Sequence, residues 1–243
     1  MSKLLLLLVF ILPSAAFAAS SSPWPMEDFD PDLENKPSLQ NGMKLYMNYC
    51  IGCHSLMFQR YERTADDLGI PHEIALEQLI FSGQKIGELM TTAMDPELAK
   101  NWFGGPPPDL TMVTRARSPD WVFNYLKTFY IDDSRPFGVN NTVFANVGMP
   151  NVMQDLQGVQ TCTERKMVEG SEVCSKLVVE EGSGVYSEQK FDQAVYDLVN
   201  FLYYVSEPAR LERQRTGLFV LIFLVILGVF TYLLNREIWK DIH

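Results

Sequence analysis

The chain has 243 residues, of which 47% are hydrophobic and 12% aromatic, and its formal net charge is −10. This length predicts one domain or two, with enough apolar side chains for a buried core. The negative charge argues against nucleic acid as a partner, because nucleic-acid-binding surfaces carry an excess of Lys and Arg.

The N-terminal segment has the pattern of a secretory signal peptide. Lys3 precedes an apolar run from Leu4 to Leu12, and a small-x-small motif follows at 16–18. The run is too short for a bilayer, which needs about 20 apolar residues. We therefore predict a signal peptide over residues 1–18, cleaved after Ala18, with a buried N-terminal helix as the alternative. An exported domain, residues 19–209, then lies in the periplasm of a bacterium.

The exported segment is acidic. Residues 19–209 contain 27 Asp and Glu against 14 Lys and Arg, a net charge of 14 − 27 = −13. A field of one sign speeds encounter with a partner of the opposite sign, so a basic protein partner is one interpretation. A general solubilising surface is the other.

The stretch NYCIGCHSLMF contains Cys50, Cys53 and His54, directly after a helix predicted over 39–50. A structural zinc site needs a second ligand pair at short spacing, and the other two cysteines are 12 residues apart with no histidine nearby. A redox dithiol is expected in a βαβ surround, and a disulfide leaves the histidine unexplained. Cys-x-x-Cys-His is the attachment pattern of haem c, in which two thiols bond to the porphyrin edge and the next residue ligates the iron. We therefore predict one covalent haem c, held by Cys50 and Cys53, with His54 as an iron ligand.

The rest of the exported segment predicts helices and loops, with no strand pattern strong enough for a sheet. Residues 19–37 are rich in Ser, Pro and acids and predict an extended arm. The other predicted helices run from Pro71 to about Ser82, from the N-cap Ser118 onward, and over 189–206, where the pattern is amphipathic. The segments between them predict a rigid loop over 103–110, a helical turn or two over 111–117, irregular chain over 130–160 and a turn or hairpin remnant over 182–186. The fold class is therefore mainly α.

Met149 is the first candidate for the second axial ligand of the iron. It lies in a Gly-Met-Pro corner outside any predicted helix, which fixes the backbone and frees the thioether to point into a pocket. Met153 and Met94 are alternatives, and an ordinary buried loop methionine is a further one. His/Met ligation suits electron transfer because it raises the reduction potential relative to two histidines.

Cys162 and Cys174 remain after the haem motif is assigned. Cysteines of an exported protein usually pair, so we predict a disulfide between them, with two free thiols as the alternative. The intervening sequence is polar and predicts no secondary structure.

The C-terminal segment predicts a membrane anchor. Seventeen uncharged residues, 218–234, include only a glycine and a threonine that are not strongly apolar. We predict a linker over 210–217, a transmembrane helix over 218–235 and a cytoplasmic tail over 236–243.

The direction of the anchor follows from export of the domain before it. The positive-inside rule mildly favours the reverse direction. Three basic residues, Arg210, Arg213 and Arg215, lie on the predicted outer side of the helix, and two, Arg236 and Lys240, lie on the predicted inner side. A cleaved signal peptide nevertheless places the haem domain outside and the C-terminus in the cytoplasm of an inner-membrane protein.

Several longer motifs resemble the cytochrome c1 family, the haem subunit of the quinol–cytochrome c reductase (cytochrome bc1) complex, in its bacterial form. They are LYMNYCIGCHSLMFQRYERTADDLGIP, KIGELMTTAM, GGPPPDLTMVTRAR, GMPNV, DLVNFLYYVSEPARLERQRTG and REIWKDIH, and they span nearly the whole mature chain. The resemblance implies a cytochrome c-like haem domain with long irregular loops and one C-terminal transmembrane helix. It also implies one-electron transfer from a Rieske iron–sulfur protein to a cytochrome c, beside cytochrome b, and no enzyme activity of the subunit by itself.

The resemblance also implies residue roles. Met149 corresponds to the distal ligand, Pro107 and Pro108 line the haem pocket beside His54, and Arg117 neutralises a haem propionate. For Arg117, a helix C-terminal cap or a surface ion pair is the structural alternative. The predicted disulfide departs from the family, whose internal disulfides precede the methionine ligand.

Two other functions stay open at the level of sequence. One is an anchored mono-haem cytochrome c that serves another oxidase. The other is a haem enzyme or gas sensor with an open iron site.

Overall fold

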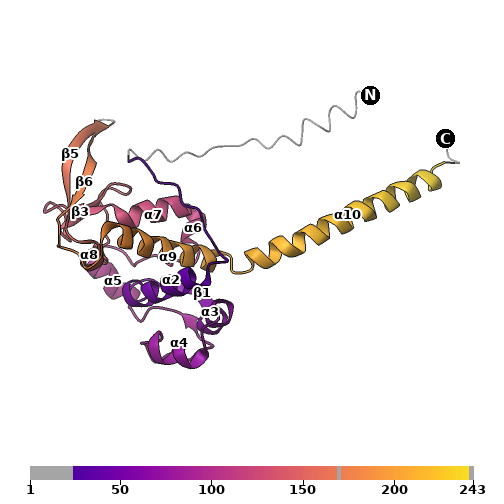
Figure 1. Ribbon diagram of the computed structural model, residues 1–243, viewed down its shortest axis with the longest axis horizontal. Coiled ribbons are helices and arrows are strands. Elements are labelled where there is room, and N and C mark those ends of the chain that lie inside the picture. The colour runs from indigo at the N-terminus through magenta and orange to yellow at the C-terminus, as the bar shows by residue number, and fades with distance from the viewer. Residues whose placement is uncertain (1–23, 169–170, 241–243) are drawn as a thin grey trace.

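The computed structural model describes residues 24–168 and 171–240. The predicted signal peptide lies outside the described residues, as do the last three residues of the predicted tail. Figure 1 shows a body of packed helices, with a two-stranded hairpin projecting from one end and one long helix extending from the other.

The described chain is mainly helical, as predicted. Its helices are α2 (Lys36–Tyr49), α3 (Tyr61–Leu68), α4 (His72–Gln78), α5 (Pro96–Phe103), α6 (Val113–Ala116), α7 (Pro119–Lys127), α8 (Gln154–Gln157), α9 (Glu188–Ser206) and α10 (Arg210–Ile238). Three antiparallel pairs of strands accompany them: β1 (Leu56–Arg60) with β2 (Leu89–Met90), β3 (Phe129–Ile131) with β4 (Val139–Asn141), and β5 (Gln160–Val168) with β6 (Ser171–Val179).

The packing of α2 against α9 forms the centre of the core. Each helix buries an apolar face, and fully buried side chains such as Tyr46 and Phe201 meet between them. The helices approach closely at Gly42, where an added Cβ would lie 2.0 Å from the carbonyl oxygen of Asp197 and 2.6 Å from the Cβ of Phe201. Only glycine permits this backbone separation, and α2 leads directly into the Cys-x-x-Cys-His motif.

The acidic N-terminal arm lies against the body. The backbone N–H of Phe29 donates to Asp120 (2.7 Å), and the Phe29 ring packs on Phe123 and Tyr196. The side chain of Asn124 on α7 accepts from the N–H of Glu27 and donates to its carbonyl. The arm was predicted over 19–37. It has no helix or strand over residues 24–35 and is anchored by these contacts, but its last two predicted residues belong to α2.

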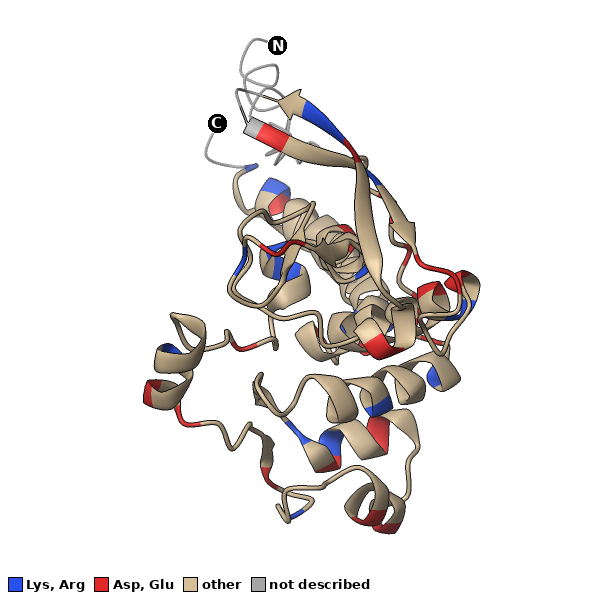
Figure 2. Ribbon diagram, turned by 90° about the vertical axis from the view of Figure 1, so that its left-hand side faces the viewer, with Lys and Arg blue, Asp and Glu red and all other residues tan. Residues whose placement is uncertain are grey.

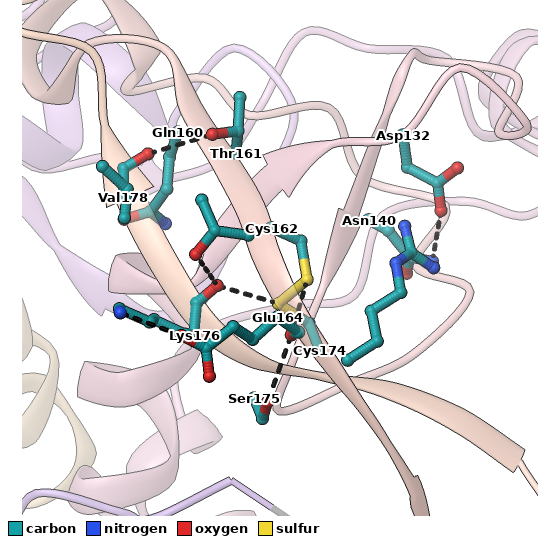
Figure 3. The surroundings of a disulfide bond; sticks show 12 residues. Asp132, Asn140, Gln160, Thr161, Cys162, Glu164, Cys174, Ser175, Lys176 and Val178 are labelled. Carbon is teal, nitrogen blue, oxygen red and sulfur yellow. Dashed lines mark hydrogen bonds and ion pairs between the residues drawn. A yellow bond between two sulfur atoms is a disulfide. The ribbon is translucent and has the colours of Figure 1, made fainter.

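The sequence missed the strands, most clearly the β5–β6 hairpin. The segment that we predicted to be structureless forms nine-residue strands joined by a disulfide between Cys162 and Cys174, with an S–S distance of 2.06 Å and a Cα–Cα distance of 5.9 Å. An ion pair between Lys176 and Glu164 also crosses the hairpin (Figure 3). Most of β5 faces solvent, so no alternation of apolar and polar residues marks it as a strand.

Helix boundaries agree with the sequence at some points and differ at others. Ser118 is the N-cap of α7, its hydroxyl accepting from the N–H of Trp121, as predicted. The helix predicted to run to Ser82 ends at Gln78, and Pro71 is its N-cap rather than its first residue. The segment over 130–160, predicted to be irregular, contains β3, β4 and α8, which are too short to leave a periodic signal.

Helix α10 is long and apolar enough to cross a membrane. None of the residues in its most apolar stretch is buried against the rest of the described chain. It includes the predicted transmembrane span. The segment 210–217, predicted as a linker, is helical and continuous with that span.

We expect Gly42→Ala to lower the free energy of unfolding by about 2 kcal/mol or more, because the methyl group meets backbone atoms that cannot move away alone. Denaturant unfolding followed by circular dichroism measures the change. Gly217→Ala is the matched control, a helical glycine whose added Cβ meets no described atom within 4 Å. Both variants gain about 1 kcal/mol of helix propensity, so equal stabilities would contradict the packing at Gly42.

Candidate haem site

The Cys-x-x-Cys-His motif is a tight turn at the C-terminal end of α2. Cys50 is the C-cap residue, and its carbonyl accepts from the N–H groups of both Cys53 and His54. The buried hydroxyl of Tyr46, one helical turn earlier, donates to the carbonyl of His54 (2.6 Å). These bonds hold two thiols and one imidazole within a single turn.

The His54 ring is buried and hydrogen-bonded through Nδ1 to the carbonyl oxygen of Pro108 at 2.7 Å. A carbonyl only accepts, so Nδ1 carries the proton and the lone pair remains on Nε2. Burial lowers the pKa of His54, although the bond to Pro108 opposes this effect. The neutral imidazole with a free Nε2 is the form that ligates a metal.

The proline-rich loop that accepts this bond is tied to the motif at further points. The N–H of Leu110 donates to the carbonyl of Ser55 (2.9 Å), and Asp109 accepts from the N–H of Met57 (2.7 Å). Asp109 also accepts from the N–H of Thr111 two residues on, so its carboxylate serves a turn. The loop is therefore held as one wall beside His54.

The thiols of the motif lie in surroundings that disfavour the thiolate. Burial raises the pKa of Cys50 to about 12, with a smaller contribution from Cys53, and burial also raises the pKa of Cys53. A structural zinc site needs four ligands, and the described residues contain no cluster of three or more His, Cys, Asp or Glu side chains that could hold a metal. The geometry thus gives no support to a zinc site.

Met149 reaches the site from the loop between β4 and α8. Its sulfur accepts a hydrogen bond from the hydroxyl of Tyr125 on α7 at 3.4 Å, and the Tyr125 ring stacks on Trp121. The alternatives Met153 and Met94 do not line the cavity, and Met153 is buried in the main core. Of the three candidate methionines, the fold brings only Met149 to the motif.

These segments enclose one cavity of about 640 Å³, within the roughly 300–1,000 Å³ typical of cofactor pockets. All seven residues predicted to bind the cofactor line it: Cys50, Cys53, His54, Pro107, Pro108, Arg117 and Met149. The remaining lining is mostly apolar and comes largely from α7, α9 and the loops around 103–110 and 144–152. Thiols, an imidazole nitrogen and a thioether around an apolar space fit a haem.

Arg117 lies at the exposed rim of the cavity as the C-cap residue of α6. Its guanidinium stacks over Trp121 at 5.2 Å and lies 6.0 Å from the ring centroid of Phe144. No ion pair to Arg117 occurs among the described residues. Arg117 is therefore a helix C-cap, as in the structural alternative. It also places a positive charge at the rim, where an anion can reach it.

Sequence reasoning missed the cavity-lining residues that lie one helical turn apart on α7 and α9. Trp121 and Tyr125 are one turn apart on α7, a spacing that indicates an ordinary buried helix face. Leu198 and Leu202 on α9 have the same spacing and also line the cavity. Helical periodicity shows that such residues are buried but does not show whether protein or cofactor covers them.

The fold and the site together define a membrane-anchored haem-binding protein. The Cytochrome C1 family model matches residues 89–242, more than half of the chain. The chain is 51% identical to a cytochrome c1 of Allochromatium vinosum, over 100% of both proteins.

Two more distant similarities accompany these matches. The chain is 38% identical to a protein of Nitrosomonas europaea named ammonia monooxygenase gamma subunit, over 100% of this chain and 99% of that protein. A solved structure titled hyperthermophilic respiratory Complex III aligns with 100% of this chain and 97% of its own, at 14% identity and a TM-score of 0.46.

The family model and the full-length relative show that this chain belongs to the cytochrome c1 family. It is thus a haem-carrying electron-transfer subunit of respiratory complex III, anchored to the membrane, and not an enzyme by itself.

Proposed function

We propose that the cavity holds one haem c, bonded through thioethers to Cys50 and Cys53 and ligated by His54 and Met149. The observation that carries the proposal is that the three side chains of the motif and Met149, which lies 95 residues after His54 (149 − 54), line one cavity. The haem supplies a one-electron couple, and a thioether ligand raises its reduction potential relative to two imidazoles.

The chain's own residues orient and shield this group. Pro108 holds the imidazole of His54 in its Nε2-ligating form, and Pro107 and Pro108 form the wall beside it. The apolar lining excludes water and competing ligands. Arg117 at the rim is suited to pair with a haem propionate, because its guanidinium carries a full charge and fixed donors.

The partners in this proposal are a Rieske iron–sulfur protein as electron donor, cytochrome b as neighbouring subunit and a cytochrome c as acceptor. An acidic exported domain complements a basic acceptor and speeds its encounter. Figure 2 shows Asp and Glu residues on separate helices, loops and strands, so the acidity is spread over the face in view.

The location in this proposal is the bacterial inner membrane, with the haem domain in the periplasm and the C-terminus in the cytoplasm. Two observations support it. One is the signal-peptide pattern at the N-terminus, and the other is the candidate span in α10, which follows the domain directly and is the one such span among residues 24–168 and 171–240.

Met149→Leu tests the ligand set, because it removes the sulfur while keeping most of the volume. We expect the oxidised variant to lose the thioether–iron charge-transfer band, and the reduced variant to bind carbon monoxide. Absorption spectra of the purified holoprotein measure both. Met94→Leu is the control and keeps the band. Ready binding of carbon monoxide to the reduced wild type would instead favour an open-site haem enzyme or sensor.

Arg117→Gln tests the propionate pairing. Loss of a cation beside the haem disfavours the reduced form, so we expect the midpoint potential to fall by tens of millivolts in a redox titration. The matched control is Arg115→Gln, two residues away, whose side chain pairs with Glu207 at 3.8 Å and does not line the cavity. Equal potentials in the two variants would leave Arg117 only its role as a helix cap.

The partners are tested by purifying the tagged full-length chain from its native membrane in mild detergent. We expect a cytochrome b and a Rieske protein to co-purify, with quinol–cytochrome c reductase activity. Recovery of the tagged chain with neither cytochrome b nor a Rieske protein would favour an anchored cytochrome c that serves another oxidase. The relative named as an ammonia monooxygenase subunit makes this alternative worth measuring.

A further inference from the structure

The segment that carries Met149 has no regular secondary structure of its own. Between the end of β4 at Asn141 and the start of α8 at Gln154, the chain contains no helix or strand. Buried backbone N–H and C=O groups nevertheless need partners. In the part of this segment before Met149, most of the bonded backbone groups find their partner in one of two adjacent side chains, Asn140 and Asn141.

Asn141 is 1% exposed and joins the segment to α7. Its Oδ1 accepts from the N–H groups of Val143 (2.9 Å) and Phe144 (3.0 Å), and its Nδ2 donates to the carbonyl of Tyr125 (2.7 Å). Tyr125 is the residue whose hydroxyl reaches the sulfur of Met149. One side-chain amide thus links the backbone before Met149 to the helix that contacts its thioether.

Asn140 does the same for the next turn of the segment. Its Oδ1 accepts from the N–H of Asn146 (2.8 Å). Its Nδ2 donates to the carboxylate of Asp132 (2.9 Å), a contact drawn in Figure 3. Asn146 adopts a left-handed conformation with φ 60°, a region that asparagine enters more readily than most other residues with a side chain. Arg135 donates to the carbonyl of the same residue (3.1 Å), so both backbone polar groups of Asn146 have a partner.

We propose that Asn140 and Asn141 are positioning residues for the distal ligand. By fixing the backbone of residues 143–146, they hold Met149 against the cavity and keep its sulfur on the iron. This inference rests on Met149 being the distal ligand. It adds that the strength of this ligation is set by two buried amides that do not line the cavity.

The residue type follows from the bonds required. Asn141 must accept from two N–H groups and donate to one carbonyl, which an amide can do and an aliphatic side chain cannot. Truncation to alanine leaves these backbone groups to find new partners, so the segment relaxes and the thioether detaches more often.

The experiment compares full-length holoprotein carrying Asn141→Ala, Asn140→Ala or Asn124→Ala with the wild type. Asn124 is the matched control because it is equally buried, also makes three backbone hydrogen bonds and lies on α7, but it holds the N-terminal arm. The readouts are the thioether–iron band, the affinity of the reduced protein for carbon monoxide, and amide hydrogen exchange at 143, 144 and 146.

We expect Asn141→Ala to raise the carbon monoxide affinity roughly tenfold or more, equivalent to about 1.4 kcal/mol, and to weaken the band. Asn140→Ala shifts both readouts in the same direction by a smaller factor. Asn124→Ala loses stability but keeps the wild-type band and affinity. We also expect faster hydrogen exchange at the backbone amides of 143, 144 and 146 in the Asn140 and Asn141 variants, which would show that the change lies in this segment.

Wild-type ligation in both the Asn140 and the Asn141 variant would overturn the inference while leaving Met149 as the ligand. The same holds if Asn124→Ala weakens ligation equally, because general destabilisation would then explain the effect. If Asn141→Ala fails to fold, Asn140→Ala against Asn124→Ala decides by the same criteria. Absence of the band from the wild type would refute the proposed ligand set, and this inference with it.

Discussion

The hydrogen bond from Nδ1 of His54 to the carbonyl of Pro108 is the interaction on which the site depends. It joins the turn after α2 to a loop that cannot form a helix. It also sets the tautomer of His54, the one histidine among the described residues that line the cavity. The proline-rich sequence makes this possible, because consecutive prolines lack N–H donors and leave their carbonyls free for other partners. Without this bond, the imidazole could rotate or carry its proton on Nε2.

The two sides of the cavity are supported in different ways. The Cys-x-x-Cys-His motif stands on α2, whose close contact with α9 at Gly42 continues into a network where Ser38 and Asn41 donate to the buried carboxylate of Asp197. Met149 instead lies in a segment without helix or strand, and backbone N–H groups of this segment bond to the side-chain amides of Asn140 and Asn141. Packing therefore supports the motif, while specific polar contacts support the segment that carries Met149.

Local sequence patterns were sufficient for much of the fold and for the proposed ligands. The apolar face of α9, the Ser118 cap and the apolar run in α10 depend on near neighbours in sequence, and the structure has all three. The haem motif is also local, since its three residues occupy one turn. The β5–β6 hairpin was missed because its strands face solvent and its stability depends on cross-strand pairs and the disulfide.

Sequence alone is enough for the mainly helical class, the C-terminal candidate membrane span, the Cys-x-x-Cys-His motif and, through the resemblance, the family. The packed chain is needed to show that Met149 rather than Met153 or Met94 lines the cavity beside that motif, and that Arg117 stacks on Trp121 at the rim. The physical reason is the range of the interactions. Periodicity and caps act within a few residues, whereas a cavity lined from α2, α7, α9 and the loops beside them exists only after those segments have packed.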